Sequence, residues 1–244
     1  MADLRGRVAL VTGSSSGIGA AIATALAERG ASIVVNSSSS VTAGERLAAE
    51  LPGAAYVQAD ISDPAEAARL VTTTVEQYGR LDILVNNAGT TEIIPHHDLD
   101  ACTNEVWERI FRVNVLGTWN VIRPAAPHLR AAGDGVILNI TSLAGIRPTG
   151  SSIPYAVSKA ALNHLTVLLA STLGPQIRVN ALAPGLIDTP WTADWDTIRA
   201  AVTQMAPLRR SGTPQDVADA CLGLVAAQYV TGQVVLVDGG MALR

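Results

Sequence analysis

Tyr155 and Lys159 are the two residues whose chemical types and spacing point most directly to catalysis. They follow Pro154, which is typical of the first turn of a helix, and a helix that begins there places the phenol and the ammonium one turn apart on the same face. A cation near a phenol favours the phenolate, so we expect Lys159 to lower the pKa of Tyr155 toward neutrality. A phenol of that kind can exchange a proton with a substrate oxygen.

Lys159 is the only lysine of the chain, since the other 16 of its 17 basic residues are arginines. An ammonium group is a compact charge with three donors, and a planar guanidinium does not replace it. The alternative is that Tyr155 only covers the stem of a surface lysine, because titratable pairs are often structural. The use of a single lysine at this position favours the catalytic interpretation.

Strand and helix patterns alternate along the chain and supply the framework for this pair. Short apolar segments between turn residues predict strands at 8–11, 32–36, 54–60, 81–85, 135–141, 177–182 and 233–237. Helical periodicity and start signals predict helices at 20–29, 64–78, 104–130, 154–173 and 214–227. The alternation predicts one α/β domain over residues 1–244, a doubly wound parallel sheet of about seven strands with helices on both faces. Ligands of such sheets lie at the carboxyl ends of the strands.

A glycine pattern, Thr12-Gly13-x-x-x-Gly17-x-Gly19, follows the first predicted strand. Gly13 permits a tight turn, Gly17 lets a pyrophosphate approach the backbone, and Gly19 lets the helix pack closely against the strand. The N-H groups at the start of the following helix are suited to phosphate. A plain tight turn is the alternative, but the position in a βαβ unit favours a dinucleotide site.

The end of the second strand, at Asn36, is expected to face the adenosine ribose. A carboxylate there would bind the ribose 2′-OH and repel a 2′-phosphate, but this chain has Asn36 followed by four serines, Ser37 to Ser40. No Arg or Lys is there to bind a phosphate strongly, so the sequence favours NADP(H) over NAD(H) only weakly. The serine run is also compatible with a flexible loop.

Further polar and small residues stand at the ends of the next strands. Asp60 and Ile61 are expected to reach the adenine, and Asn86-Asn87-Ala88-Gly89 leaves room for the cofactor, although its two amides could instead tie strand ends together. Asn114 lies in an apolar helical stretch. A buried amide there is costly unless it is paired, so we expect it to have a defined partner.

Taken together, these motifs resemble those of the classical short-chain dehydrogenases/reductases, from Leu4 to Gly240. The resemblance rests on the glycine pattern, Asn86-Asn87-Ala88-Gly89, Asn114, Ser142, Tyr155-x-x-x-Lys159 and Pro184-Gly185. It implies a Rossmann-type fold, a catalytic tetrad of Asn114, Ser142, Tyr155 and Lys159, and usually a homotetramer. The connections at 173–177 and 226–229 look shorter than in the family, which affects loop shape and subunit contacts rather than chemistry.

The resemblance also implies reversible hydride transfer between a nicotinamide and a ketone or secondary alcohol. In reduction Tyr155 would give a proton to the carbonyl oxygen, Ser142 would hydrogen-bond that oxygen, and Lys159 would hold the nicotinamide ribose. Asn114 would anchor a water, and Thr189 would hold the carboxamide. The dinucleotide-binding residues implied are Gly13, Ser15, Ser16, Gly17, Ile18, Gly19, Asn36, Ser37, Ser38, Asp60, Ile61, Asn87, Ala88, Gly89, Ile140, Tyr155, Lys159, Pro184, Gly185, Ile187 and Thr189.

Six apolar or aromatic residues are expected to form the substrate pocket: Ile93, Ile94, Leu143, Ile146, Trp191 and Trp195. They favour an apolar or mixed ketone over a sugar, although the two tryptophans could also serve as lid packing or as a subunit contact. Arg112, Arg123 and Arg130 leave open a second function, the reduction of 3-oxoacyl groups on an acidic carrier protein. A third possibility, of another class, is a non-catalytic dinucleotide-binding sensor or scaffold.

Composition narrows the remaining classes of function. A net charge of -4 and a pI near 5.5 give no electrostatic basis for binding nucleic acid. No segment approaches the roughly 20 apolar residues of a membrane span, so we expect a soluble, cytoplasmic protein. Cys102 and Cys221 lie in helical patterns, and neither they nor the four histidines have metal-ligand spacing, so no metal is expected. A hydrophobic content of 48% fits a sheet buried on both faces and an oligomer.

Overall fold

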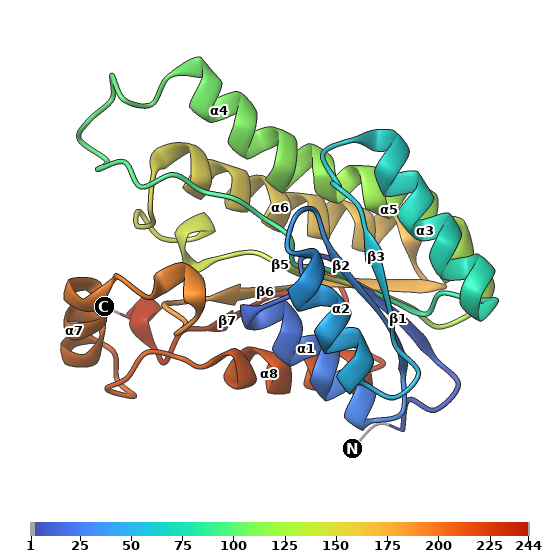
Figure 1. Cartoon of the computed structure of the whole chain (residues 1–244). Coiled ribbons are helices and arrows are strands. Elements are labelled where there is room, and N and C mark those ends of the chain that lie inside the picture. The colour runs from blue at the N-terminus through green and yellow to red at the C-terminus, as the bar shows by residue number, and fades with distance from the viewer. Residues whose placement is uncertain (1–2, 244) are drawn as a thin grey trace.

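The computed structural model describes residues 3–243 and contains a seven-stranded parallel sheet (Figure 1). The strand order is β3-β2-β1-β4-β5-β6-β7, and every neighbouring pair is parallel. The strands are β1 (Val8–Val11), β2 (Ser32–Ser37), β3 (Ala55–Gln58), β4 (Ile83–Asn86), β5 (Gly135–Ile140), β6 (Ile177–Pro184) and β7 (Val234–Val237). The order reverses between β1 and β4, so a crevice opens at the carboxyl ends of these strands. The predicted fold class is confirmed.

Helices cover both faces of the sheet (Figure 1). One face carries α1 (Gly17–Glu28), α2 (Val41–Glu50) and α8 (Pro214–Ala226), and the other carries α3 (Pro64–Tyr78), α4 (Asn104–Phe111), α5 (Thr118–Ala132) and α6 (Ile153–Leu173). Beyond the end of β6, α7 (Asp196–Met205) lies beside the C-terminal end of the chain. Among the helices of residues 3–243, none combines the length and the apolar character that a bilayer crossing needs.

The strands read as continuous apolar runs because both faces of the sheet are buried. In β1, Ala9 and Val11 belong to the core beneath α1 and α8, whereas Leu10 belongs to the core beneath α3, α5 and α6. All three are fully buried. The central strands are thereby fixed from two sides, and the residues at their carboxyl ends have a rigid support.

The helical stretch predicted at 104–130 is not one regular helix. A π-helical segment, η1 (Arg112–Gly117), separates α4 from α5, and Asn114 lies within it. An inserted π-turn is a common feature of functional sites, because it changes the direction in which the following residues point. Here it lies against α6, which carries Tyr155.

Two helices have no counterpart among the sequence predictions, α2 and α7. The serine run and Gly44 concealed α2, but Gly44 is a position of close packing: a Cβ there would lie 2.3 Å from Cε2 of Tyr56. In α7, Ile198, Val202 and Met205 recur at a helical spacing that a search for amphipathic segments detects. Of these two helices, only α7 contributes residues to the cavity described below, so its omission left the predicted site incomplete.

Candidate active site

A cavity of about 1340 Å³ runs along the carboxyl ends of the strands. Pockets for drug-sized ligands occupy roughly 300–1,000 Å³, so this cavity has room for a dinucleotide and a second molecule. At one end it is lined by Ser15 to Ile18 and by Ser37 to Ser40, and at the other by Tyr155 and Trp191. The cavity thus joins the glycine turn to the predicted catalytic pair.

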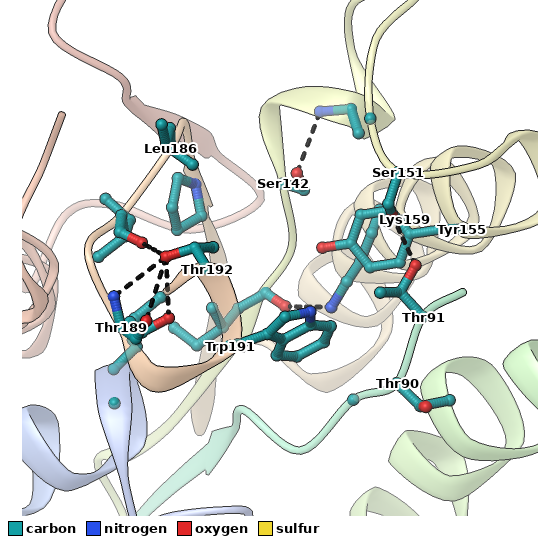
Figure 2. Close-up of a pocket in the computed structure, with 18 of the residues that line it drawn as sticks. Thr90, Thr91, Ser142, Ser151, Tyr155, Lys159, Leu186, Thr189, Trp191 and Thr192 are labelled. Carbon is teal, nitrogen blue, oxygen red and sulfur yellow. Dashed lines mark hydrogen bonds between the residues drawn. The ribbon is translucent and has the colours of Figure 1, made fainter. Parts of the chain in front are cut away.

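Tyr155 and Lys159 lie on the first two turns of α6, as the sequence predicts. The hydroxyl of Ser152 caps this helix and accepts a hydrogen bond from the backbone N-H of Tyr155 at 3.4 Å. The Lys159 ammonium donates to the carbonyl of Ile140 at 2.9 Å and lies 5.7 Å from the centroid of the Tyr155 ring (Figure 2). Only 4% of Lys159 is exposed, so its charge is held inside the cavity wall.

The pKa values of this pair are set mainly by burial. Burial raises the pKa of the Tyr155 phenol above its ordinary value, and the Ser142 hydroxyl acts in the opposite direction. Burial lowers the pKa of Lys159 to about 8. The direction predicted for the pKa of Tyr155 from its spacing to Lys159 is therefore wrong for the protein alone, because the desolvation of the buried phenol dominates. At neutral pH the phenol holds its proton, the state that a proton donor requires.

Ser142 lies two residues after the end of β5 and caps the short 3-10 helix η2 (Leu143–Gly145). Its Oγ accepts a hydrogen bond from the backbone N-H of Ala144 at 3.1 Å (Figure 2). The hydroxyl proton stays available, and the influence of this group on the pKa of Tyr155 places the two hydroxyls beside each other. Together they present two donors to one oxygen atom in the cavity.

Asn114 is fully buried, and the expected partner of its amide exists. The Nδ2 group donates to the carbonyl of Thr90 at 3.0 Å and to Oγ of Ser158 at 2.9 Å, and Oδ1 accepts from the N-H of Thr90 at 2.7 Å. Ser158 in turn donates to the carbonyl of Tyr155 at 2.7 Å. Asn114 itself does not line the cavity, and its hydrogen bonds join the start of α6 to the segment after β4.

The glycine turn has the close packing that a dinucleotide cradle needs. Gly13 has a φ of +61°, and a Cβ there would lie 2.8 Å from Cα of Ala88. A Cβ on Gly19 would lie 2.5 Å from Nδ2 of Asn87, which donates to the carbonyls of Thr12 and Gly13 at 3.0 and 2.9 Å. Gly19 packs behind the turn and does not line the cavity, whereas all the other predicted dinucleotide residues do. The residues that line this part of the cavity therefore fit a dinucleotide.

Asn36 differs from its prediction, because its side chain is turned inward. Its Nδ2 donates to the carbonyls of Val57 and Ala59, both at 3.1 Å, and its Oδ1 accepts from the N-H of Gly13 at 3.3 Å. The amide is therefore committed to joining β1, β2 and β3. Ser37 is also occupied, through a 2.8 Å hydrogen bond with the Tyr56 hydroxyl, which leaves Ser38 as the first exposed side chain after the strand.

Replacing Asn36 by aspartate is expected to destabilise the fold rather than to change cofactor choice. A carboxylate there would face two carbonyl oxygens without a donor, which costs on the order of 1–3 kcal/mol or more. Urea unfolding of Asn36→Asp beside the parent protein measures this loss. Unchanged stability, with a clear shift toward NADH, would show that the Asn36 side chain faces the ribose after all.

Five of the six residues predicted for the substrate pocket line the far part of the cavity, and we call this part the substrate chamber: Ile93, Ile94, Leu143, Trp191 and Trp195. Ile146 does not line it and is 43% exposed, because it follows the tight turn of η2 and points outward. Sequence reasoning missed polar residues of the chamber, among them Thr90, Thr91, Ser151 and Arg147, and the apolar residues of α7. The Thr91 and Ser151 hydroxyls bond each other at 2.5 Å (Figure 2).

Trp191 lies on the short 3-10 helix η3 (Pro190–Thr192), which one arginine fastens to α7. The Arg199 guanidinium donates from Nε to Asp188 at 2.8 Å and from Nη2 to the carbonyl of Thr192 at 3.0 Å. The hydroxyl of Ser211 also donates to Asp188, and these two donors lower the pKa of that carboxyl. Thr189 and Trp191 therefore lie on one segment that Arg199 and Ser211 hold in place.

Comparisons with known proteins give the family. A family model described as enoyl-(acyl carrier protein) reductase matches residues 13–242. A solved short-chain type dehydrogenase/reductase from Mycobacterium ulcerans is 34% identical, with a TM-score of 0.93 over 100% of this chain and 92% of that one. The chain belongs to the short-chain dehydrogenase/reductase family. As a member of the short-chain dehydrogenases/reductases, it is an NAD(P)-dependent oxidoreductase acting on CH-OH and C=O groups.

Two further members of the family are similar along nearly their whole length. A protein of Streptomyces violaceoruber, named as ketoacyl reductase 2 of the granaticin polyketide synthase, is 59% identical over 97% of this chain and 96% of its own. A gluconate 5-dehydrogenase of Burkholderia cenocepacia, solved in complex with NADP and tartrate, is 32% identical, with a TM-score of 0.91 over 99% and 97% of the two chains. The family thus includes both ketone reductases and alcohol dehydrogenases.

Proposed function

We propose that Tyr155, Ser142 and Lys159 carry out the proton chemistry of a ketone reductase whose substrate lies in the chamber beneath Trp191. The supporting observation is their position on one wall of the cavity, between the glycine turn and the chamber. When bound, the nicotinamide supplies or accepts the hydride at the carbonyl carbon. In reduction the Tyr155 phenol gives its proton to the carbonyl oxygen, so the two electrons of the C=O bond end in the new O-H bond.

The neighbouring groups prepare this step. The Ser142 hydroxyl donates to the same oxygen and fixes its position, while Lys159, held by the Ile140 carbonyl, supplies positive charge as the phenol becomes a phenolate. The Thr189 side chain faces Gly17, since a Cβ on Gly17 would lie 3.4 Å from Cγ2 of Thr189. These residues are suited to hold the dinucleotide, and Asn114 positions α6 through Ser158.

The substrate proposed is an apolar or aromatic ketone. The chamber offers the exposed face of Trp191 together with Ile93, Ile94 and Leu143, and a flat ring system gains most from such a surface. The relative named as a ketoacyl reductase of a polyketide synthase supports a ketone of this kind. It equally supports the second candidate, a 3-oxoacyl group on a carrier protein, for which Arg112, Arg123 and Arg130 are exposed on η1 and α5.

The proposal is tested by following the absorbance of the reduced nicotinamide at about 340 nm. Each member of a panel of ketones is assayed with NADH and NADPH, and each alcohol with the oxidised cofactors. We expect turnover of aryl and alkyl ketones and little turnover of sugars. Tight dinucleotide binding without turnover of any member of the panel would instead support the non-catalytic sensor or scaffold.

The cofactor proposed is NADP(H). No carboxylate follows β2, and Ser38, Ser39 and Ser40 present exposed hydroxyls at the start of α2. We expect Ser38→Asp to raise the ratio of NADH to NADPH efficiency by at least about tenfold, because a carboxylate near the 2′-phosphate is repelled by roughly 1–4 kcal/mol at contact distance. Steady-state kinetics with both cofactors measure the ratio, and Ser38→Asn is the neutral control. The same ratio of NADH to NADPH efficiency in the parent, Ser38→Asp and Ser38→Asn would contradict the placement of the 2′-phosphate beside Ser38.

Assembly as a homotetramer, action as one catalytic domain and location in the cytoplasm are also proposed. Exposed apolar side chains on η1, α5 and α6, including Leu116, Trp119, Val157 and Leu168, support burial between subunits. Light scattering of the purified protein gives the mass that tests the tetramer.

A further inference from the structure

The substrate chamber contains one arginine, Arg147. Among the residues that line the cavity, only Arg147 and Lys159 are lysine or arginine, and Lys159 is tied to the Ile140 carbonyl beside Tyr155. Arg147 lies in the segment between Ser142 and Tyr155, five residues after the first and eight before the second. Arg147 is exposed at the rim of a chamber that also contains the hydroxyls of Thr90, Thr91 and Ser151 and one carboxylate, Asp194. Its positive charge has no part in the proton transfer described above.

Local structure fixes Arg147 in place. Its backbone N-H donates to the carbonyl of Leu143 at 2.9 Å, and its own carbonyl accepts from the N-H of Thr149 at 2.7 Å. Its Nη2 donates to the carbonyl of Ala242 in η4 (Met241–Leu243) at 2.5 Å. The guanidinium is therefore held at a defined place on the rim, and an arginine that is already ordered loses less entropy when it binds a ligand.

No carboxylate neutralises this charge within residues 3–243. Eight other arginines, none of which lines the cavity, have an acidic side chain within 4.0 Å: Arg5, Arg7, Arg46, Arg80, Arg109, Arg178, Arg199 and Arg210. Asp238 precedes η4, and its two oxygens accept from the N-H groups of Gly240 and Ala242. A guanidinium has five N-H donors, and Arg147 uses one of them on Ala242.

We propose that Arg147 binds an anionic oxygen group of the substrate, remote from the reacting carbonyl, and so selects ketones that carry a carboxylate or a phosphate. This inference rests on the proposed function, because it assigns the substrate class of the same site. The planar fork of a guanidinium matches both anions, and a bidentate pair adds orientation as well as affinity. A carboxylate would belong to a free acid, and a phosphate to the pantetheine arm of a carrier-bound chain.

The experiment compares substrates that differ only in charge. One pair is an aryl ketone with a carboxyl group and its methyl ester, and the other is a 3-oxoacyl pantetheine and its 4′-phosphate. Each is assayed for kcat/KM and for binding by tryptophan fluorescence, with the parent enzyme, Arg147→Gln and Arg147→Lys. The matched control is Arg69→Gln, whose guanidinium also donates to a backbone carbonyl, that of Gln58 at 2.7 Å, but lies outside the cavity.

We expect the parent enzyme to prefer the anionic member of at least one pair by roughly 10- to 100-fold in kcat/KM. Arg147→Gln should lose that preference while the neutral member keeps its rate, and Arg147→Lys should keep part of it. The pair that responds identifies carboxylate or phosphate as the anion. Arg69→Gln should behave as the parent.

Two results would overturn the inference. The first is that the parent enzyme has the same kcat/KM for the anionic and the neutral member of both pairs. The second is that Arg147→Gln loses kcat/KM equally on both members, which is the behaviour of a residue that only holds η4. Should Arg147→Gln not fold, competition of the free acid against the ester on the parent enzyme still decides. Turnover of neutral ketones without anion preference refutes this inference alone, whereas anion-dependent binding without turnover refutes the proposed function alone.

Discussion

Tyr155→Phe is expected to remove turnover while leaving dinucleotide binding nearly intact. The substitution deletes the proton donor and nothing else, because the ring still packs beside Gly150 and the Lys159 ammonium still reaches the Ile140 carbonyl. General acid catalysis contributes roughly 10²- to 10⁴-fold, and a reduction with no alternative donor should lose at least that factor. Initial rates with a reactive ketone and a fluorescence titration with the dinucleotide measure the two effects separately.

Tyr78→Phe is the matched control for this prediction. Its hydroxyl donates to the Gly53 carbonyl at 3.0 Å and accepts from Nε2 of Gln77 at 3.4 Å, but Tyr78 does not line the cavity. Loss of that hydroxyl should leave the rate within about twofold. A Tyr155→Phe enzyme that keeps a substantial part of the parent rate would remove the phenol from the mechanism, whatever the control does.

Lys159→Met is expected to abolish turnover and to stabilise the protein at neutral pH. The folded-state pKa of Lys159 is about 8, against 10.5 in the unfolded chain, so the buried charge opposes folding by about 3 kcal/mol below pH 8. The variant gains this stability but loses the hydrogen bond to the Ile140 carbonyl, which costs about 1 kcal/mol. Urea unfolding near pH 7 should show the variant to be more stable by roughly 2 kcal/mol.

The stability difference between the parent protein and Lys159→Met depends on pH. Between pH 8 and 10.5 the folded parent releases the Lys159 proton while the unfolded chain retains it, so the parent gains stability as pH rises. The advantage of Lys159→Met should therefore shrink between about pH 7 and about pH 9.5, below the ordinary titration of tyrosine. Lys159→Arg, which keeps its charge, should show no such rise. An advantage of Lys159→Met that does not change with pH would contradict the assignment.

Features with a local cause were predictable from the sequence. The alternation of apolar runs and helical patterns gave the parallel sheet, because buried strands and amphipathic helices have different periods. The glycine turn was equally predictable, since a Cβ on Gly13 would collide with Ala88 and a Cβ on Gly19 with Asn87. The same holds for Tyr155 and Lys159, whose spacing places them on one helix face.

Features that depend on tertiary contacts were not predictable in the same way. Asn36 lies near the end of β2, where a ribose ligand is expected, yet its amide donates to the carbonyl of Val57 in β3 and to that of Ala59 just after it. The pKa of Tyr155 depends on how deeply the phenol is buried, which spacing does not express. Ile146 points outward because η2 turns the chain immediately before it.

The fastening of α7 by Arg199 has a mechanical consequence. Because this guanidinium binds both Asp188 and the Thr192 carbonyl, a displacement of α7 would also strain the segment that carries Thr189 and Trp191. The walls of the two parts of the cavity are therefore mechanically coupled.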